Sequence, residues 1–319
     1  MKFITKIISA AAALAAFCSV SYAQEEPAIQ PSGTYLYVQR DTCDLFMDVY
    51  NPAPGSQTSI DGVKKPSIIF IFGGGFIMGR RDEPSYLPWF KKLTEDGYRV
   101  FSIDYRLGLK GVKKIGITQS KVLGDAIHLA MEDLFSAVNF IIENADELGV
   151  QPDNIVVSGS SAGAITSLQA DWEISNGTPY AKVLPEGFRF AGVMSFSGAI
   201  YSDQGLPKYK TGAAPTLFLH GTDDKLVPYT RIKFMNLAFA GSSTIVKEFQ
   251  DKKYNYNILR FKDRGHEIAN NMMISYPDEI QFLETNVMRK ERRIVDAMID
   301  DPSIPVPDWA KATPDDLYK

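Results

Sequence analysis

The sequence has 319 residues, of which 45% are hydrophobic and 23% are charged. These proportions exclude a disordered, collagen-like or coiled-coil chain, and the length suits one large α/β domain or two smaller domains. The formal charge of −4 provides no basic field to attract nucleic acid, and two cysteines cannot form a disulfide scaffold.

The first residues have the pattern of a secretory signal peptide. Lys2 and Lys6 precede an apolar run over 7–17, and small side chains follow at Ser21 and Ala23, the −3 and −1 positions of a cleavage site. The apolar run is too short to cross a bilayer, which takes about 20 residues. We therefore expect cleavage after Ala23 and a secreted or periplasmic protein.

Two alternatives to a removed signal peptide over 1–23 are a buried N-terminal helix and a lipid anchor at Cys18. Phe17 argues against the anchor, because lipoprotein processing requires a small residue before the cysteine. No other stretch of the sequence looks membrane-spanning. Once the signal peptide is removed only Cys43 remains, so no intramolecular disulfide is expected.

Residues 24–319 are expected to form a single domain in which strands and helices alternate. Alternating or continuous apolar runs predict strands, and apolar residues three and four apart predict helices. The segments expected as strands are 34–40, 45–50, 67–72, 99–104, 154–158, 190–196, 216–220 and 257–261. The segments expected as helices are 88–96, 123–142, 162–174, 229–252, 267–287 and a charged helix over 287–300. The charged helix and the Pro-spaced tail after it make up the last part of the chain, about 288–319.

The alternation of these elements predicts a mostly parallel central sheet of about eight strands with helices on both faces. The run SIIFIF at 67–72 has no polar alternation, as expected of a strand that is buried on both faces. The fold class is therefore α/β.

The sequence GSSAG at 159–163 lies between an expected strand and an expected helix. It fits G-x-S-x-G with Ser161 at its centre, and a sharp turn of this kind exposes a nucleophile at the C-terminal edge of a sheet. Ser158 and Ser160 are close by but not centred between the glycines, and we expect them to hydrogen-bond within the turn.

A serine hydroxyl needs a base to become a good nucleophile, and the chain has three histidines. His266 is the candidate, because it lies on a loop after the last expected strand and can reach over the sheet edge. His128 lies beside the apolar stripe of the long helix and is expected to be structural. His220 ends a strand and is expected to shape the turn that follows.

An acid must hold the imidazole in the right tautomer, and two carboxylates follow the strand at 216–220. Asp224 is the favoured acid and Asp223 is the alternative. The carboxylate that does not contact the histidine is expected to cap the turn or the next helix.

The glycines at 73–75 follow the strand at 67–72. Glycines allow unusual dihedral angles, so the amides of Gly74 and Gly75 are expected to bind an oxyanion together with the amide of Ala162. The alternative is a phosphate-binding loop, but the segment has neither a Walker lysine nor a G-x-G-x-x-G that opens a helix. No metal or organic cofactor is required by this chemistry.

Taken together, these segments resemble the α/β-hydrolase superfamily, in its hormone-sensitive-lipase-like and feruloyl- and acetyl-xylan-esterase-like carboxylesterases. The resemblance covers about 34–287. It rests on FGGGF at 72–76, DYRL at 104–107, GSSAG at 159–163, HGTDDKLVP at 220–228 and GHE at 265–267. It implies Ser161 as the nucleophile, Asp224 as the acid and His266 as the base, in the chain order of that fold.

One position departs from the family's pattern. The glycine box of these carboxylesterases usually starts with His, and Phe72 stands there in this sequence. The substitution removes an imidazole that orders the loop, but it leaves the backbone donors of the oxyanion site in place.

The resemblance implies a serine-dependent carboxylic ester hydrolase that forms an acyl-enzyme and acts on a small-molecule or carbohydrate ester. Phe76, Trp89 and Tyr201 are candidates for lining an acyl or sugar pocket, with ordinary packing as the alternative. A serine peptidase of the prolyl-oligopeptidase type and a non-catalytic binding protein on the same scaffold are the other functions to consider. The sequence indicates neither the acyl specificity nor the oligomeric state.

Overall fold

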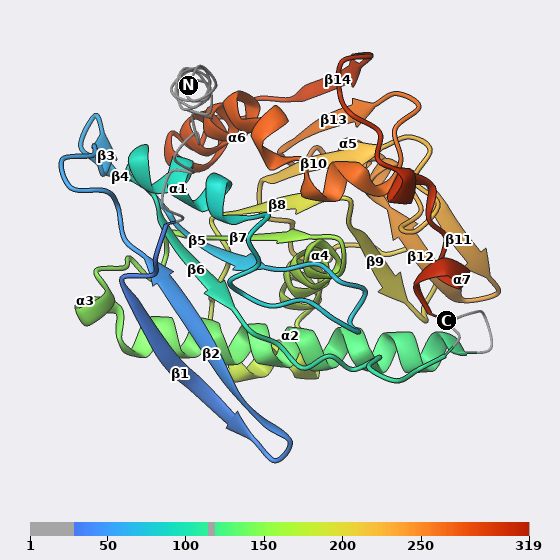
Figure 1. Ribbon diagram of the computed structural model, residues 1–319, viewed down its shortest axis with the longest axis horizontal. Helices are drawn as coiled ribbons and strands as arrows, with labels where there is room; N and C mark the ends of the chain where they lie inside the picture. Colours follow the sequence, from blue (N-terminus) through green and yellow to red (C-terminus); the bar gives the residue numbers. More distant parts are fainter. Residues whose placement is uncertain (1–28, 114–118, 319) are drawn as a thin grey trace, which may run out of the picture.

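The computed structural model describes residues 29–113 and 119–318 of the chain. A nine-stranded sheet runs through the middle of the molecule and is covered by helices on both faces (Figure 1). The expected signal peptide over 1–23, including Cys18, lies outside the described residues. Among the described helices, none combines the length and the apolar character needed to cross a membrane.

The strand order in the sheet is β1-β2-β6-β5-β7-β8-β10-β13-β14. The β1–β2 and β2–β6 pairs are antiparallel, and every later neighbouring pair is parallel, which confirms the predicted mostly parallel sheet. The strands are β1 (Gly33–Arg40), β2 (Cys43–Tyr50), β5 (Ser67–Ile71), β6 (Arg99–Ile103), β7 (Ile155–Ser160), β8 (Gly192–Phe196), β10 (Thr216–Gly221), β13 (Tyr256–Phe261) and β14 (Val295–Ile299). A separate two-stranded hairpin is formed by β3 (Ser59–Ile60) and β4 (Val63–Lys64).

Two helical layers enclose the sheet (Figure 1). On one face α1 and α6 lie together, and on the other face α2 packs against α4. The α-helices are α1 (Leu87–Glu95), α2 (Ser120–Glu143), α3 (Ala145–Leu148), α4 (Ala162–Asn176), α5 (Ser242–Lys252), α6 (Tyr276–Phe282) and α7 (Pro314–Leu317).

The middle of the sheet is the centre of the hydrophobic core. Every residue of β5 and β7 is buried, as the uninterrupted apolar run at 67–72 predicted. Such strands are covered on both faces, so the chain reaches the surface only in the loops beyond their ends. The loops that follow the C-terminal ends of the parallel strands therefore carry the exposed chemistry.

The predicted helix over 229–252 is wrong in its first half. Residues 231–241 form a hairpin of β11 (Arg231–Phe234) and β12 (Leu237–Gly241), and the helix begins only at Ser242. Burial alternates along β12, and this period of two marks a half-buried strand. The hairpin pairs with β9 (Ala199–Ser202) in a separate three-stranded sheet.

The predicted charged helix over 287–300 is also wrong, because residues 295–299 form the edge strand β14. Val295, Ala297 and Ile299 are half-buried and alternate with exposed residues, and Asp296 pairs with Arg260 of β13 at 2.6 Å. Charged side chains on an edge strand discourage pairing with further chains. Of the charges that suggested a solvated helix, Asp296 lies on the exposed side of the strand, and the charged residues at 289–293 precede it.

The predicted helix over 267–287 is broken into several pieces. Two 3₁₀ turns, His266–Asn270 and Met272–Ile274, precede α6, which continues into a π-helical turn at Leu283–Met288. Pro277 lies in the first turn of α6. Proline fits the first turn of a helix but cannot continue one, so a new helix starts there.

A buried carboxyl group joins the two helices on the α1 face. Glu279 of α6 is fully buried and accepts hydrogen bonds from Trp89 Nε1 at 2.7 Å and from Ser275 Oγ at 2.8 Å. Burial raises the pKa of Glu279 to about 8, although both hydrogen bonds act in the opposite direction. The folded chain therefore holds a proton that the unfolded chain releases near pH 4.5.

We predict that Glu279→Gln makes stability less dependent on pH. Because the folded pKa lies above the unfolded pKa, the contribution of Glu279 is complete below pH 4.5 and is lost as pH rises towards 8. The loss is at most about 1.4 kcal/mol per pH unit for one proton. Urea unfolding at pH 5, 6, 7 and 8 measures it. Exposed Glu143→Gln is the control, and a pH-independent difference between wild type and Glu279→Gln would contradict the prediction.

Candidate active site

Ser161 occupies the sharp turn between β7 and α4. Its backbone has φ 51° and ψ −114°, a conformation that residues with a side chain rarely adopt. The turn is fixed by the bond from the Ser161 amide to the Phe196 carbonyl at 2.9 Å, and by the bond from the Ile165 amide to the Ser161 carbonyl at 2.9 Å. The strained turn directs the hydroxyl outward at the C-terminal edge of the sheet.

Both flanking glycines are needed for this turn. A Cβ at Gly159 would lie 2.2 Å from the carbonyl carbon of Gly163. A Cβ at Gly163 would lie 1.9 Å from the carbonyl oxygen of Ile71 in β5. Because the obstructing atoms belong to the backbone, no side-chain movement relieves either clash. The spacing of G-x-S-x-G is thus a packing requirement of β5, β7 and α4.

Ser161, His266 and Asp224 form one chain of hydrogen bonds. His266 Nε2 lies 2.8 Å from Ser161 Oγ, and His266 Nδ1 lies 2.8 Å from Asp224 Oδ2. An ionised carboxylate only accepts hydrogen bonds, so Nδ1 carries the proton and Nε2 is free to accept the serine proton. All three residues are buried, and each follows the C-terminal end of a parallel strand.

The structure separates the two neighbouring aspartates. Asp223 is half-exposed and pairs with Lys225, whereas Asp224 is buried. Asp224 Oδ1 accepts hydrogen bonds from the amides of Leu226 and Val227, each at 2.9 Å. The carboxylate therefore fixes the turn with one oxygen and holds His266 with the other. Burial alone would raise the pKa of Asp224, but His266 and His220 more than offset it and hold that pKa well below its usual range.

The other two histidines lie where they contact neither Ser161 nor each other. His128 stacks on Tyr180 with ring centroids 4.3 Å apart, as a structural residue of α2. His220 hydrogen-bonds the Val227 carbonyl at 3.1 Å, which fits the expected role in the turn. Sequence reasoning missed that His220 Nε2 also lies 3.4 Å from Asp224 Oδ2, behind the His266 contact.

The glycine loop lies next to Ser161. A Cβ at Gly73 would be 3.3 Å from the Ser161 Cβ, and Gly74 and Gly75 have φ of 119° and 62°. The amide of Gly73 is already bonded to Tyr86 Oη at 3.2 Å. Within the described residues no protein acceptor is recorded for the amides of Gly74, Gly75 and Ala162, and Ala162 begins α4. Donors at a helix N-terminus suit an anion.

Other contacts hold the loop in which Phe72 replaces the usual histidine. Phe72 stacks on Tyr105 with ring centroids 4.4 Å apart, and Tyr105 Oη donates to the Phe72 carbonyl at 3.1 Å. Tyr86 Oη, which accepts the Gly73 amide, lies 3.3 Å from Asn270 Oδ1. Asn270 also accepts from Ser160 Oγ at 3.1 Å. These contacts join the glycine loop to the histidine loop, and the sequence motifs did not indicate them.

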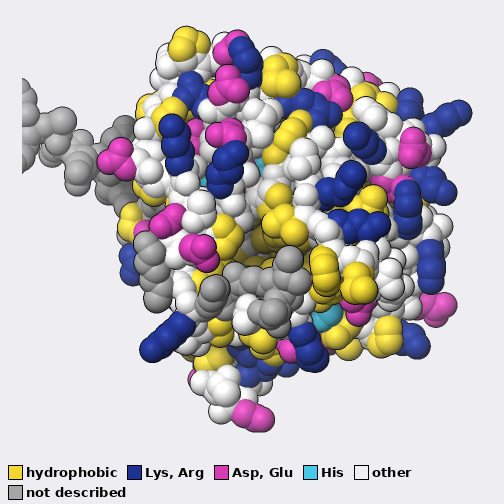
Figure 2. All heavy atoms as spheres, turned by 90° about the vertical axis from the view of Figure 1, so that its right-hand side faces the viewer, with side chains coloured by type: hydrophobic (Ala, Val, Ile, Leu, Met, Phe, Trp, Pro, Cys, Tyr) yellow, Lys and Arg dark blue, Asp and Glu magenta, His cyan; other side chains and the backbone are white. Residues whose placement is uncertain are grey.

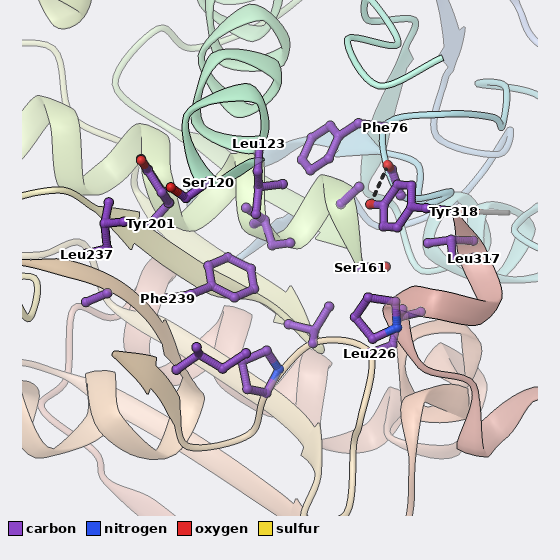
Figure 3. Close-up of a pocket in the computed structure, with 18 of the residues that line it drawn as sticks. Phe76, Ser120, Leu123, Ser161, Tyr201, Leu226, Leu237, Phe239, Leu317 and Tyr318 are labelled. Atoms are coloured by element: carbon purple, nitrogen blue, oxygen red, sulfur yellow. Dashed lines mark hydrogen bonds between the residues drawn. The ribbon is translucent and has the colours of Figure 1, made fainter. Parts of the chain in front are cut away.

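An apolar cavity of about 360 Å³ opens beside Ser161 (Figure 3). Among the described residues that line it, none has a charged side chain. Its walls come from the glycine loop, α2, α4, the β11–β12 hairpin and α7. On the surface that carries the hairpin and α7, hydrophobic side chains border a hollow (Figure 2). The volume lies within the range of small-molecule pockets, about 300–1,000 Å³.

The three expected lining residues have different positions. Phe76 and Tyr201 line the cavity (Figure 3). Trp89 does not, which corrects the expectation. It is buried against the rings of Phe70 and Phe196, and its indole nitrogen is bonded to Glu279 on the α1 face. The sequence pattern of α1 predicts an amphipathic helix, but it does not predict which face of the sheet the ring of Trp89 packs against.

The described residues offer no metal centre: no three His, Cys, Asp or Glu side chains among 29–113 and 119–318 gather as a bound ion would require. A hydroxyl beside a neutral imidazole, backed by a carboxylate and facing free amides, is arranged for nucleophilic attack on a carbonyl carbon.

Comparison with known proteins gives two matching families. Residues 125–284, half of the chain, match the family model described as Phospholipase/Carboxylesterase, and residues 47–178 match the one described as BD-FAE.

Two curated relatives match part of the sequence. Carboxylesterase 1C of Rattus norvegicus is 30% identical over 38% of this chain and 20% of its own length. Para-nitrobenzyl esterase of Bacillus subtilis (strain 168) is 31% identical over 42% of this chain and 25% of its own length. The match thus spans a quarter or less of these relatives.

Solved structures share the fold. The native form of Est2, an esterase from Thermogutta terrifontis, is 22% identical with a TM-score of 0.56, covering 80% of this chain and 92% of its own. The propionate-bound form is 21% identical with a TM-score of 0.54, covering 80% of this chain and 96% of its own. The sheet and helix arrangement described above is therefore one that known proteins share.

We predict that Gly163→Ala severely destabilises the protein. Helix propensity alone favours alanine over glycine by up to about 1 kcal/mol. The clash with the Ile71 carbonyl opposes this, and we expect a net loss of more than about 3 kcal/mol. Thermal and urea unfolding measure the loss.

The control is Gly177→Ala at the other end of α4. Gly177 has φ 59° and open space around the Cβ position, so alanine there costs only the left-handed strain of about 1–2 kcal/mol. A Gly163→Ala variant as stable as the Gly177→Ala variant would show that the turn does not depend on this backbone contact.

Proposed function

Because the chain belongs to the phospholipase/carboxylesterase family, we propose that it is a serine hydrolase that cleaves carboxylic esters through Ser161, His266 and Asp224. The observation that carries the proposal is the 2.8 Å contact between His266 Nε2 and a strained Ser161 that opens on an apolar cavity. A hydroxyl held in this way has both its base and a place for the acyl group of a substrate.

The first half-reaction forms an acyl-enzyme. Ser161 Oγ bonds to the ester carbonyl carbon while its proton passes to His266 Nε2. The carbonyl oxygen becomes an oxyanion, which the amides of Gly74, Gly75 and Ala162 stabilise. The tetrahedral carbon then expels the alcohol oxygen, and that oxygen takes the proton from His266.

The second half-reaction releases the acid. Water gives a proton to His266 Nε2 and bonds to the acyl carbon, and Ser161 Oγ leaves with that proton. One ester and one water give one acid and one alcohol. Asp224 keeps the imidazole in position and stabilises its cationic form throughout both halves.

The lining of the cavity supports an apolar acyl group. The described side chains that line it are uncharged, so an apolar acyl chain or ring is stabilised there by removal from water. The alcohol part of the ester would face the open side of the pocket. We place simple esters with apolar acyl groups first, and an acylated carbohydrate is the second candidate because a sugar alcohol could extend into solvent.

We predict that Ser161→Ala lowers kcat for p-nitrophenyl butyrate by about 10⁴-fold or more while leaving the melting temperature nearly unchanged. Ser158→Ala is the matched control, because Ser158 is buried in β7 three residues earlier and its hydroxyl has no hydrogen-bond partner among the described residues. Undiminished turnover by the Ser161→Ala variant would defeat the proposal.

A substrate screen separates the other functions. Faster cleavage of dipeptidyl p-nitroanilides than of esters indicates a peptidase of the prolyl-oligopeptidase type. No turnover and no labelling of Ser161 by a fluorophosphonate probe indicates a non-catalytic binding protein. Acetylated xylan and feruloylated arabinose test the carbohydrate esters against p-nitrophenyl esters of increasing acyl length.

We also propose that residues 1–23 direct export and are removed after Ala23. The basic start, the apolar run and the small residues before the cleavage site support this. The prediction is that N-terminal sequencing of protein recovered outside the cytoplasm begins at Gln24. A start at Cys18 would indicate lipid anchoring, and an intact Met1 would contradict export with cleavage.

A further inference from the structure

The last described part of the chain, residues 303–318, lies across the two loops that carry the site. We call it the C-terminal strap. Arg264, two residues before His266, donates a hydrogen bond to the Asp301 carbonyl just ahead of the strap. Within the strap, Ala310 is fully buried, and its carbonyl oxygen lies 2.1 Å from the place that a Cβ at Gly265 would take. The strap therefore packs directly on the residue before His266.

The strap ends in the short helix α7, whose start is marked by a capping box. In α7, Thr313 and Asp316 form a reciprocal capping box, with the Thr313 amide 3.1 Å and its hydroxyl 2.7 Å from Asp316 Oδ2. Pro314 occupies the first turn, where its missing N–H costs nothing. These features shape the turn locally and leave Leu317 and Tyr318 to make contacts elsewhere.

Those two residues contact the glycine loop beside Ser161 (Figure 3). Tyr318 Oη donates to the Gly75 carbonyl at 3.0 Å. Leu317 Cδ2 lies 2.5 Å from the place that a Cβ at Gly75 would take. Tyr318 Oη lies 3.3 Å from the same place, so the two side chains pack together against Gly75.

The same side chains form a wall of the cavity. Leu317 and Tyr318 line it together with Pro314, and Phe76 and Phe239 also face it (Figure 3). Leu317 is half-buried and Tyr318 is buried. Burial raises the pKa of Tyr318 to about 12, so its hydroxyl remains a donor at neutral pH.

We propose that the C-terminal strap is a working part of the ester-hydrolysing site, in which Tyr318 positions the oxyanion loop and Leu317 limits the length of the acyl group. The proposal rests on the function proposed above. Tyr318 is a positioning residue because it acts through the carbonyl of Gly75, and Leu317 determines specificity because its side chain meets the acyl chain.

The physical reason lies in the freedom of the loop. Gly74 and Gly75 both have positive φ, and glycine reaches many backbone conformations at little cost. Backbone donors lower the barrier only when they already point to the place where the oxyanion forms. A bond to the Gly75 carbonyl fixes the peptide that follows this donor, so its loss affects the transition state more than substrate binding.

The first test is Tyr318→Phe, which removes one oxygen and keeps the ring. We expect kcat for p-nitrophenyl butyrate to fall about tenfold while KM stays within twofold, because loss of a whole oxyanion donor costs about 10²–10³-fold and Tyr318 acts one step away. Tyr254→Phe is the control, since it removes a tyrosine–carbonyl bond to Tyr209 elsewhere. An unchanged kcat in Tyr318→Phe overturns the positioning role.

The second test changes the size of Leu317. We expect Leu317→Ala to raise kcat/KM for an octanoyl ester relative to an acetyl ester by about fivefold or more, and Leu317→Trp to lower the same ratio. Leu184→Ala is the control, because Leu184 is buried but does not line the cavity. Shifts of this kcat/KM ratio in opposite directions from the wild-type value support the specificity role. A ratio that equals the wild-type value in both Leu317 variants overturns it.

Different results would contradict the proposed function and the role of the strap. If the wild-type chain hydrolyses no ester and Ser161 takes no fluorophosphonate label, the proposed function itself is wrong. If the wild type is active and the Tyr318 and Leu317 variants match it in kcat and acyl-length profile, only the role of the strap is wrong.

Discussion

The backbones of β5, β7 and α4 contact each other directly at two glycines, and the geometry of the site depends on this contact. With no Cβ at Gly159 or Gly163, the helix can start so near the sheet that Ser161 must take a φ of 51°. A conformation of that kind persists only where the surrounding structure imposes it. Here the imposing atoms are the carbonyl of Ile71 at the end of the buried strand β5 and the carbonyl of Gly163 in α4, so the strained serine is held by backbone that cannot move aside.

From this fixed point the other groups are brought in by loops. The parallel strands end at one edge, and the loops after β5, β10 and β13 deliver the glycine donors, Asp224 and His266 to it. Further bonds tie the loops to each other: Asn270 bridges the histidine loop to Tyr86, and Tyr318 reaches the glycine loop from the C-terminal strap. Rigid strands and cross-linked loops together provide the preorganisation that stabilising an oxyanion requires.

Local patterns in the sequence were enough for the central features, and long-range packing decided the rest. Ser161 could be predicted because a strand, a glycine turn and a helix are adjacent in the chain. The motif favoured Asp224, but Asp223 stayed an alternative because both follow the same strand and only the folded turn buries one of them. The β11–β12 hairpin and β14 were mistaken for helices, because β11 is exposed along its whole length and β12 and β14 are too short for a period of two to stand out in the sequence. The capping box at Thr313 indicates a helical turn, but nothing local says that the turn lies against Gly75.

The most direct test of the account is to locate the acyl group during turnover. Wild-type protein is mixed with excess p-nitrophenyl butyrate, quenched with acid within milliseconds, digested and mapped by mass spectrometry. The account predicts one butyryl group per chain, on the peptide that contains Ser161 and on that side chain. A butyryl group on Ser158 or Ser160, or an unmodified Ser161 peptide while p-nitrophenol is released, would contradict it.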